Sequence, residues 1–261
     1  MSGSEIFRAP AEAYDRFVGR YGAELASGLI ALCGVRSGMS AVDVGCGPGA
    51  LTAALAEQLG AGSVRAADPS DVFVAACRRR APGVDVVVAS AEALPFANDS
   101  FDAALSQLVV NFMTDARAGV CEMARVTRPG GVVCSCVWDY AGGMTLLRTF
   151  WDAAREVDDA YARADEGSVM RWCREGDLAA LWRDAGLSAV ADTALEVTAS
   201  YEDFDDLWNP FLSGVGPAGA FCQSLEDQRR IAVREAMRRR LDVGDGPFEL
   251  TARAWAVTGT A

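Results

Sequence analysis

The stretch that most constrains the fold is "AVDVGCGPGAL", residues 41–51, in which an apolar run breaks into a turn with three glycines. The apolar run has the length of a buried strand, and "GALTAALAEQLG", residues 49–60, has the composition of a helix closed by Gly60. A glycine-rich turn between a strand and a helix lets backbone N–H groups approach a ligand closely. The segment therefore predicts a strand, a turn that can bind a ligand, and a helix.

Apolar runs of strand length alternate with segments of helical period through the first half of the chain. Further strands are expected at 63–68, 84–90, 100–110 and 132–139, and helices at 71–81 and 115–127. Residues 187–201 and 248–259 alternate like two more strands and are separated by helical segments. We therefore predict an α/β fold of the Rossmann-like, doubly wound type. It has a mostly parallel seven-stranded sheet, helices on both faces and helical insertions.

The composition excludes several chemistries. The chain has no histidine, and all 24 of its basic residues are arginine, so it has no lysine either. The chain therefore cannot supply a P-loop Lys, a lysine Schiff base, a Ser-His triad or His metal ligands, and we predict no metal site. The net charge of −12 repels phosphate backbones and anionic lipid, so no nucleic-acid partner is expected.

Other sequence features indicate where the protein is found. The eight cysteines include no C-x-x-C pair, and several lie in apolar runs, which is typical of reduced core thiols. No stretch reaches the roughly 18 to 20 apolar residues of a membrane span, and the N-terminus lacks the features of a signal peptide. We predict a soluble, cytoplasmic protein without a membrane span, and a homodimer stays open.

Two cofactor classes fit the glycine turn by itself. Gly45, Gly47 and Ala50 satisfy the dinucleotide pattern G-x-G-x-x-G/A, and Asp68 ends the next strand, where an acid can bind a ribose hydroxyl. An NAD(P)-dependent oxidoreductase and an S-adenosylmethionine (SAM) enzyme therefore both fit, and a purely structural turn is a third reading. The turn has no Arg to bind a pyrophosphate, and the chain has no His or Lys to assist hydride transfer.

Four segments in order resemble motifs of the class I SAM-dependent methyltransferases. They are "VDVGCGPGAL", the acid in "AADPSD", the loop and strand "SAEALPFANDSFDAALS", and the turn into the fifth strand, "RVTRPGGVVCSCVW". Together they span residues 40–138 and are similar to the small-molecule branch that includes quinone-biosynthesis C-methyltransferases. The resemblance implies methyl transfer from SAM to a small-molecule acceptor, with S-adenosylhomocysteine (SAH) as product. A non-catalytic SAM-binding protein stays open.

The resemblance also implies which residues bind the cofactor. Asp43 would lie near the ammonium group, Asp68 would accept from both ribose hydroxyls, and Gln107 would lie beside the sulfonium. The complete set is Asp43, Gly45, Gly47, Gly49, Asp68, Pro69, Ala91, Glu92 and Gln107, in which the glycines lie under the methionine part and Ala91 and Glu92 bind adenine.

The whole chain, 1–261, is predicted to be a single methyltransferase domain. It would comprise an N-terminal helical cap (1–35), a SAM-binding core (36–140) and two helical insertions (141–185 and 200–245) that form a substrate lid. Because ligands bind beyond the carboxyl ends of parallel strands, several aromatic and polar residues are expected to face the acceptor. They are Tyr14, Phe17, Tyr21, Asn111, Phe112, Met113, Trp138, Asp139 and Tyr140, of which Asp139 or Tyr14 could take a proton from it.

Overall fold

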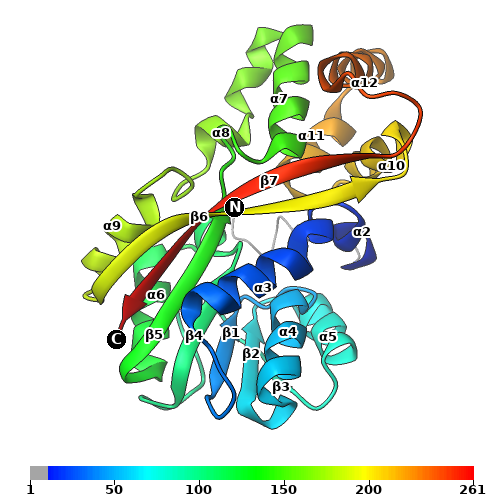
Figure 1. Ribbon diagram of the computed structural model, residues 1–261. Helices are drawn as coiled ribbons and strands as arrows, with labels where there is room; N and C mark the ends of the chain where they lie inside the picture. The colour runs from blue at the N-terminus through cyan, green and yellow to red at the C-terminus, as the bar shows by residue number, and fades with distance from the viewer. Residues whose placement is uncertain (1–10) are drawn as a thin grey trace.

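The structure is a computed structural model that describes residues 11–261, and a seven-stranded sheet forms its centre (Figure 1). The strand order is β3-β2-β1-β4-β5-β7-β6. Strands β1 to β5 are parallel, and β7 runs antiparallel between β5 and β6. The strands are β1 (Ala41–Val44), β2 (Val64–Asp68), β3 (Asp85–Val88), β4 (Phe101–Gln107), β5 (Thr127–Trp138), β6 (Ser188–Tyr201) and β7 (Phe248–Thr260). The predicted mostly parallel seven-stranded sheet is confirmed.

Helices cover both faces of the sheet. On one face α3 (Gly22–Cys33), α4 (Ala50–Leu59) and α5 (Asp71–Arg80) lie side by side, and on the other α6 (Ala116–Val126) contacts α9 (Asp177–Asp184) (Figure 1). Because both faces are covered, every residue of β1 is buried, as expected of a central strand in a parallel sheet. Helix α4 ends at the predicted Gly60, and Ser70 caps α5 by accepting from the N–H of Phe73.

A layer of helices lies beyond the carboxyl end of β5. It consists of α7 (Thr145–Val157), α8 (Glu166–Val169), α10 (Phe204–Trp208), α11 (Gly216–Ser224) and α12 (Asp227–Leu241), with short 3-10 turns after α7 and after α10 (Figure 1). An aromatic cluster holds the layer together: Phe150 stacks on Phe211 at 4.5 Å and meets Trp151 edge to face at 5.2 Å. Both predicted insertions are thus helical, but α9, within 141–185, lies beside α6 and outside this layer.

One segment differs from the prediction made from the sequence, and another lies partly outside the described residues. The "RPGG" segment was expected to be a turn before the fifth strand, but β5 already begins at Thr127, and the pairing with β4 shifts register between Phe101 and Ala103. The N–H of Gly130 donates to the carbonyl of Ala261, which ties this segment to the chain's last strand. The N-terminal cap contains α2 (Ala11–Arg16) and α3, and residues 1–10 of its predicted span lie outside the described residues.

No helix among residues 11–261 is long and apolar enough to cross a membrane.

Candidate active site

A cavity of about 310 Å³ lies where β1, β2 and β4 end. Its wall is formed by the glycine turn, the ends of these strands, α2, and the loops before β4 and α6. Eight of the nine residues predicted to bind the cofactor line it: Asp43, Gly45, Gly47, Asp68, Pro69, Ala91, Glu92 and Gln107. The ninth, Gly49, is not among the lining residues. A Cβ at Gly49 would lie 2.9 Å from the Sγ of Cys77, so this glycine lets α4 and α5 approach each other.

The glycine turn folds back on the neighbouring strand. The N–H groups of Gly45 and Cys46 donate to the carbonyl of Ala67 at 2.7 and 3.0 Å. Gly45 has a φ of +76°, and a Cβ there would lie 2.5 Å from both methyl groups of Val109. The turn therefore needs glycine at this position, both for its backbone conformation and for its contact with the loop after β4.

Asp68 presents a buried carboxylate to the cavity. Its side chain is 6% exposed, one oxygen accepts from the N–H of Gly47 and the other from the N–H of Ser70, both at 2.9 Å. Burial raises the pKa of Asp68, and the two N–H groups partly offset this. A carboxylate has about four acceptor positions, so roughly two are left for hydroxyl donors of a ligand.

Two further acceptors in the cavity wall have no partner among the described residues. Asp43 accepts from the hydroxyl of Thr52 at 2.6 Å through one oxygen, while its Oδ1 is unpaired. Gln107 donates to the carbonyl of Gly22 at 3.1 Å, while its Oε1 is unpaired. An unpaired buried acceptor costs about 1–3 kcal/mol, which a ligand with N–H donors or positive charge would recover. Together with Asp68, these groups fit the amine, sulfonium and ribose hydroxyls of SAM.

Glu92 has several hydrogen-bond donors from its own chain. Its carboxylate accepts from the hydroxyl of Ser90 and from the N–H groups of Thr114 and Asp115, at 2.9 and 3.2 Å for the two amides. Burial raises the pKa of Glu92, but these hydrogen bonds outweigh it and lower the pKa overall. Glu92 thus fixes the loop between β4 and α6 on one side of the cavity, and its contact with adenine stays a prediction.

A smaller recess of about 30 Å³ adjoins the cavity. Tyr14, Val18, Leu108 and Phe112 line both spaces. Of the residues predicted to face the acceptor, five line the recess and Met113 lines the larger cavity; the five are Tyr14, Phe17, Phe112, Trp138 and Tyr140. Tyr21 and Asn111 line neither space: the hydroxyl of Tyr21 lies 3.1 Å from that of Tyr201, and the amide of Asn111 donates to the hydroxyl of Tyr140 at 3.5 Å.

Asp139 lies outside both spaces. It is paired with Arg253, whose Nη2 and Nε lie 2.6 and 3.0 Å from its Oδ2, and it accepts from the N–H groups of Gly142 and Gly143. These contacts fix the turn between β5 and α7 against β7. The structure thus does not bring this carboxylate to the position from which it was expected to take a proton.

Two site features have no local signal in the sequence. Arg80 belongs to the basic run at 78–80 of α5, yet it lines the cavity and pairs with Asp15, which ties α5 to α2. Glu166 lies in a polar segment, yet it is buried and lines the recess. Only the tertiary fold brings these side chains into the site.

Two buried carboxyls make the stability of the protein depend on pH. Burial raises the pKa of Asp43 and of Glu166 to about 7, against about 4 in an unfolded chain. Between these values the folded state holds protons that the unfolded state has released. The free energy of unfolding should therefore fall between pH 5 and pH 8, by on the order of 1–3 kcal/mol per group.

Denaturant unfolding at pH 5, 6, 7 and 8 checks this expectation, and the chain has no histidine to obscure it. The Asp43→Asn variant should show a clearly smaller decrease than the wild type. Stability that rises across this range, or an unchanged slope in the variant, would contradict the burial of an ionisable Asp43.

The sheet order, the glycine turn and the acid at the end of β2 are the features expected of the SAM-dependent class. Residues 42–135 match the family described as a methyltransferase domain. The chain is 33% identical over 168 residues to demethylmenaquinone methyltransferase of Beutenbergia cavernae, which covers 60% of this chain and 69% of that protein. It is 31% identical over 171 residues to malonyl-[acyl-carrier protein] O-methyltransferase of Salmonella typhimurium, and the matched residues are 63% of this chain and 67% of that protein. The chain therefore belongs to the SAM-dependent methyltransferases.

Two further comparisons give the extent of a sequence match and a shared fold. The chain spans about half (48%) of an uncharacterized Streptomyces fradiae transposon protein, at 33% identity over 175 residues. A structure of Haemonchus contortus phosphoethanolamine N-methyltransferase 2 with SAH bound has a TM-score of 0.60 at 14% identity, covering 96% of this chain and 56% of that one. The family and the named methyltransferase relatives support methyl transfer with SAM as cofactor, and the NAD(P)-dependent and non-catalytic alternatives are not favoured.

Proposed function

We propose that the protein methylates a small, apolar acceptor, with SAM in the 310 Å³ cavity and the acceptor's reactive end toward the recess. The observation that supports this most directly is Asp68, a buried carboxylate that faces the cavity with acceptor positions to spare. Asp43 and Gln107 add two unpaired acceptors to the same wall. Arg80, the arginine among the lining residues, is paired with Asp15, so these acceptors favour a cationic nucleoside over a dinucleotide, whose pyrophosphate would need positive charge.

Each residue has a defined task in this proposal. Asp68 binds the ribose hydroxyls, Asp43 and Gln107 accept from the amine and face the sulfonium, and Ala91 with Glu92 bounds the adenine. The bound sulfonium supplies an activated methyl group, so the protein contributes mainly alignment and exclusion of water. α2, the loop after β4 and the helical layer close the space around both ligands.

The lining of the recess indicates the nature of the acceptor. Phe17, Trp138, Leu147 and Pro217 make it apolar and largely aromatic. The relatives include a demethylmenaquinone methyltransferase and a malonyl-[acyl-carrier protein] O-methyltransferase. For this chain we propose only a substrate of the first kind, which is planar and apolar. We further propose that the protein acts in the cytoplasm, and a homodimer is compatible with this function.

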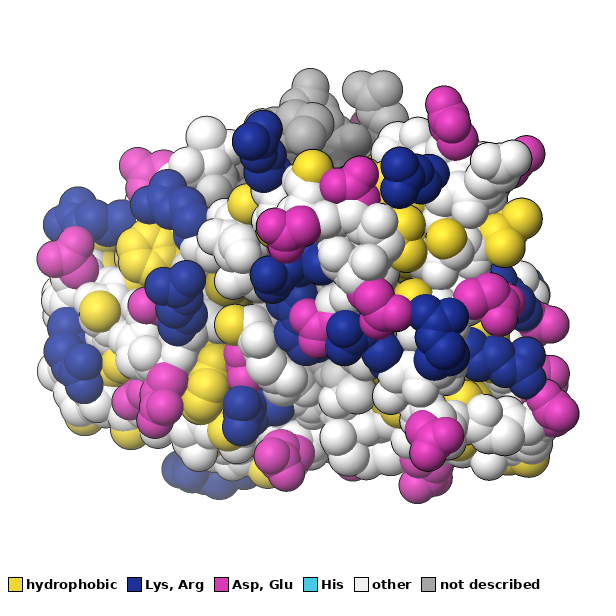
Figure 2. Space-filling model, turned by 90° about the horizontal axis from the view of Figure 1, so that it is seen from above, with side chains coloured by type: hydrophobic (Ala, Val, Ile, Leu, Met, Phe, Trp, Pro, Cys, Tyr) yellow, Lys and Arg dark blue, Asp and Glu magenta, His cyan; other side chains and the backbone are white. Residues whose placement is uncertain are grey.

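Surface charge argues against a nucleic-acid substrate. Figure 2 shows arginines interspersed with acidic side chains over the face that it displays. The basic run at 238–240 follows this pattern: Arg239 and Arg240 pair with Glu156, and Arg238 pairs with Asp245. Paired charges of this kind leave little positive field to attract a phosphate backbone.

Calorimetric titration of the purified protein with SAH, and with NAD as the matched control, tests the proposed function. We expect SAH to bind with a Kd on the order of micromolar and NAD to show no heat above dilution. Binding of NAD without SAH would instead support an oxidoreductase. Tight SAH binding with no methyl transfer to any quinol, phenol or amine would support a non-catalytic SAM-binding protein.

A further inference from the structure

Glu166 is a buried carboxyl group at the end of the acceptor recess. It is the first residue of α8, only 2% of it is exposed, and it lines the recess together with Tyr140 and Trp138. The recess shares four lining residues with the SAM cavity, so a molecule that enters it lies next to the cofactor. Its volume of about 30 Å³ suits a hydroxyl-bearing edge, because a single water needs at least about 10–15 Å³.

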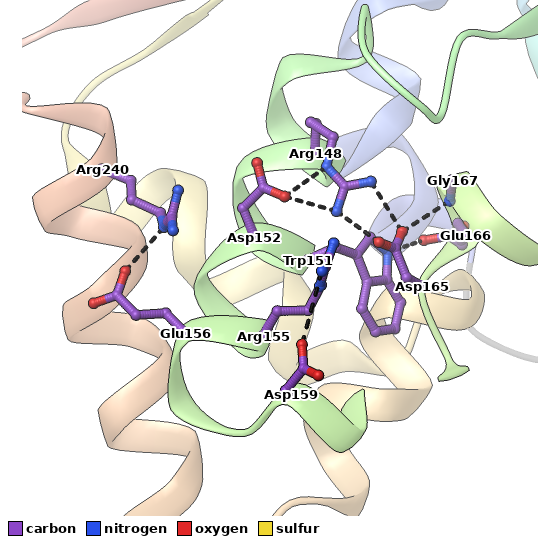
Figure 3. A network of polar contacts seen from close by, with 10 residues as sticks. All are labelled: Arg148, Trp151, Asp152, Arg155, Glu156, Asp159, Asp165, Glu166, Gly167 and Arg240. Carbon is purple, nitrogen blue, oxygen red and sulfur yellow. Dashed lines mark hydrogen bonds and ion pairs between the residues drawn. The ribbon is translucent and has the colours of Figure 1, made fainter. Parts of the chain in front are cut away.

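The surroundings hold Glu166 in place without neutralising it (Figure 3). The indole Nε1 of Trp151 donates to its Oε2 at 2.9 Å. The nearby guanidinium of Arg148 is engaged elsewhere: it binds both oxygens of Asp165, at 2.7 and 3.0 Å, and also Asp152. No ion pair links Glu166 to a basic side chain among residues 11–261. Its carboxyl is therefore oriented but not paired with a positive charge.

The protonation of the recess centres on Glu166. Burial raises the pKa of Glu166 to about 7 and the charge of Asp165 adds to this, while the Trp151 hydrogen bond, the charge of Arg148 and a backbone hydrogen bond from Ala218 oppose it. The other ionisable groups of the recess, Tyr140 and Tyr14, have their pKa raised mainly by burial, so both phenols stay protonated at neutral pH. Glu166 is thus the recess group that can exchange a proton near pH 7.

Tyr140 complements Glu166 as a donor. Its hydroxyl oxygen accepts a hydrogen bond from the amide nitrogen of Asn111, 3.5 Å away, so the hydroxyl proton of Tyr140 is available to an oxygen in the recess. A hydroxyl oxygen can accept from Tyr140 while it donates to Glu166. A protonated amine has no lone pair for Tyr140, and it would lose its hydration among aromatic side chains. The recess is therefore suited to a hydroxyl group on an apolar, planar body.

We propose that Glu166 is a catalytic residue that accepts the proton of a phenol or enol hydroxyl on the acceptor, so that the enzyme is an O-methyltransferase. This inference rests on the proposed function. The O–H bond breaks, its proton goes to the carboxylate of Glu166, and the electron pair of the oxygen forms the bond to the methyl carbon. The bond from that carbon to sulfur breaks with its electrons left on sulfur. The products are a methyl ether, SAH and a protonated Glu166, which then loses its proton to water.

The test measures methyl transfer from SAM to naphthalene-1,4-diol and catechol, with benzylamine as the amine probe and mass spectrometry of the products. We expect the wild type to form methyl ethers of the hydroxyl probes. Glu166→Gln keeps the size of the side chain and an acceptor for Trp151, and it should lower kcat by about 10²- to 10⁴-fold. Its Kd for SAH and its thermal midpoint should stay close to those of the wild type.

The pH profile separates proton transfer from a purely structural role. In the wild type, kcat/KM should rise with pH through a midpoint near 7, because only ionised Glu166 accepts the proton. Trp151→Phe removes a hydrogen bond that lowers the pKa of Glu166, so the midpoint should move to higher pH. Glu175→Gln, the same substitution at an exposed glutamate, should leave rate and profile unchanged.

Each contrary result has a distinct meaning. A Glu166→Gln variant that turns over at the wild-type rate would overturn the role of Glu166. Methylation of benzylamine alone, or of no probe by a protein that binds SAH, would overturn the assignment of a hydroxyl acceptor. If the wild type does not bind SAH at all, the proposed function itself fails.

Discussion

Replacing Asp68 with alanine should weaken SAH binding by about 10²- to 10⁴-fold, the largest effect of any single change in the cofactor cavity. Asp68 is buried at the end of β2, lines the cavity and accepts from the N–H of Gly47 in the glycine turn. Two hydrogen bonds from ribose hydroxyls to a charged group contribute about 1.5–3 kcal/mol each. The variant would also leave the N–H of Gly47 without its acceptor.

Two further variants make this result specific. Asp71→Ala removes an exposed acid from the first turn of the adjoining helix α5, and it should change SAH affinity little. Asp68→Asn keeps the size and one acceptor oxygen, so its loss should be intermediate. Calorimetry measures all three, and a Kd for Asp68→Ala equal to that of the wild type would contradict the assignment of the ribose site.

Replacing Gly45 with alanine should destabilise the whole domain. The φ of +76° costs a residue with a Cβ about 1–2 kcal/mol, and the Cβ would lie 2.5 Å from both methyl groups of Val109, which adds about 1–3 kcal/mol of overpacking. We therefore expect a loss of about 2–5 kcal/mol and a thermal midpoint lower by on the order of 10 °C. Differential scanning calorimetry measures both.

The two causes can be separated. At Gly47, with a φ of +50°, a Cβ would meet no atom within 4 Å, so Gly47→Ala should show the conformational cost alone. Adding Val109→Ala to the Gly45→Ala variant should recover part of the loss, because it removes the two methyl groups that the new Cβ meets. A Gly45→Ala protein that melts with the wild type would show that the turn is not packed as described.

Local patterns in the sequence were enough to predict most of the fold and the centre of the site. The strand, turn and helix at 41–60 were predictable because their residues are adjacent and their glycines mark a specific backbone conformation. Asp68 was predictable because it ends the next strand, and parallel strands bring their carboxyl ends to one edge. The antiparallel β7 between β5 and β6 followed only from the structure, since strand order depends on long-range pairing.

The rest of the site depends on contacts between distant segments. Asp139 directly follows β5 and was therefore expected to face a ligand, but Arg253 on β7 binds it instead. Glu166 looks like a solvated residue in a polar segment until α7 and α11 enclose it. Arg80 is part of a basic run, yet it pairs with Asp15 on α2 and lines the cavity. Such pairings have no periodic signal in the sequence.

The most direct test of this site is a crystal structure of the protein grown with SAH. We expect SAH along the carboxyl ends of β1 and β2, with both ribose hydroxyls within hydrogen-bond distance of Asp68 and the sulfur toward the recess that holds Glu166. SAH bound in another place, or a cavity that stays without SAH at saturating concentration while the protein is folded, would contradict the assignment of the cofactor site.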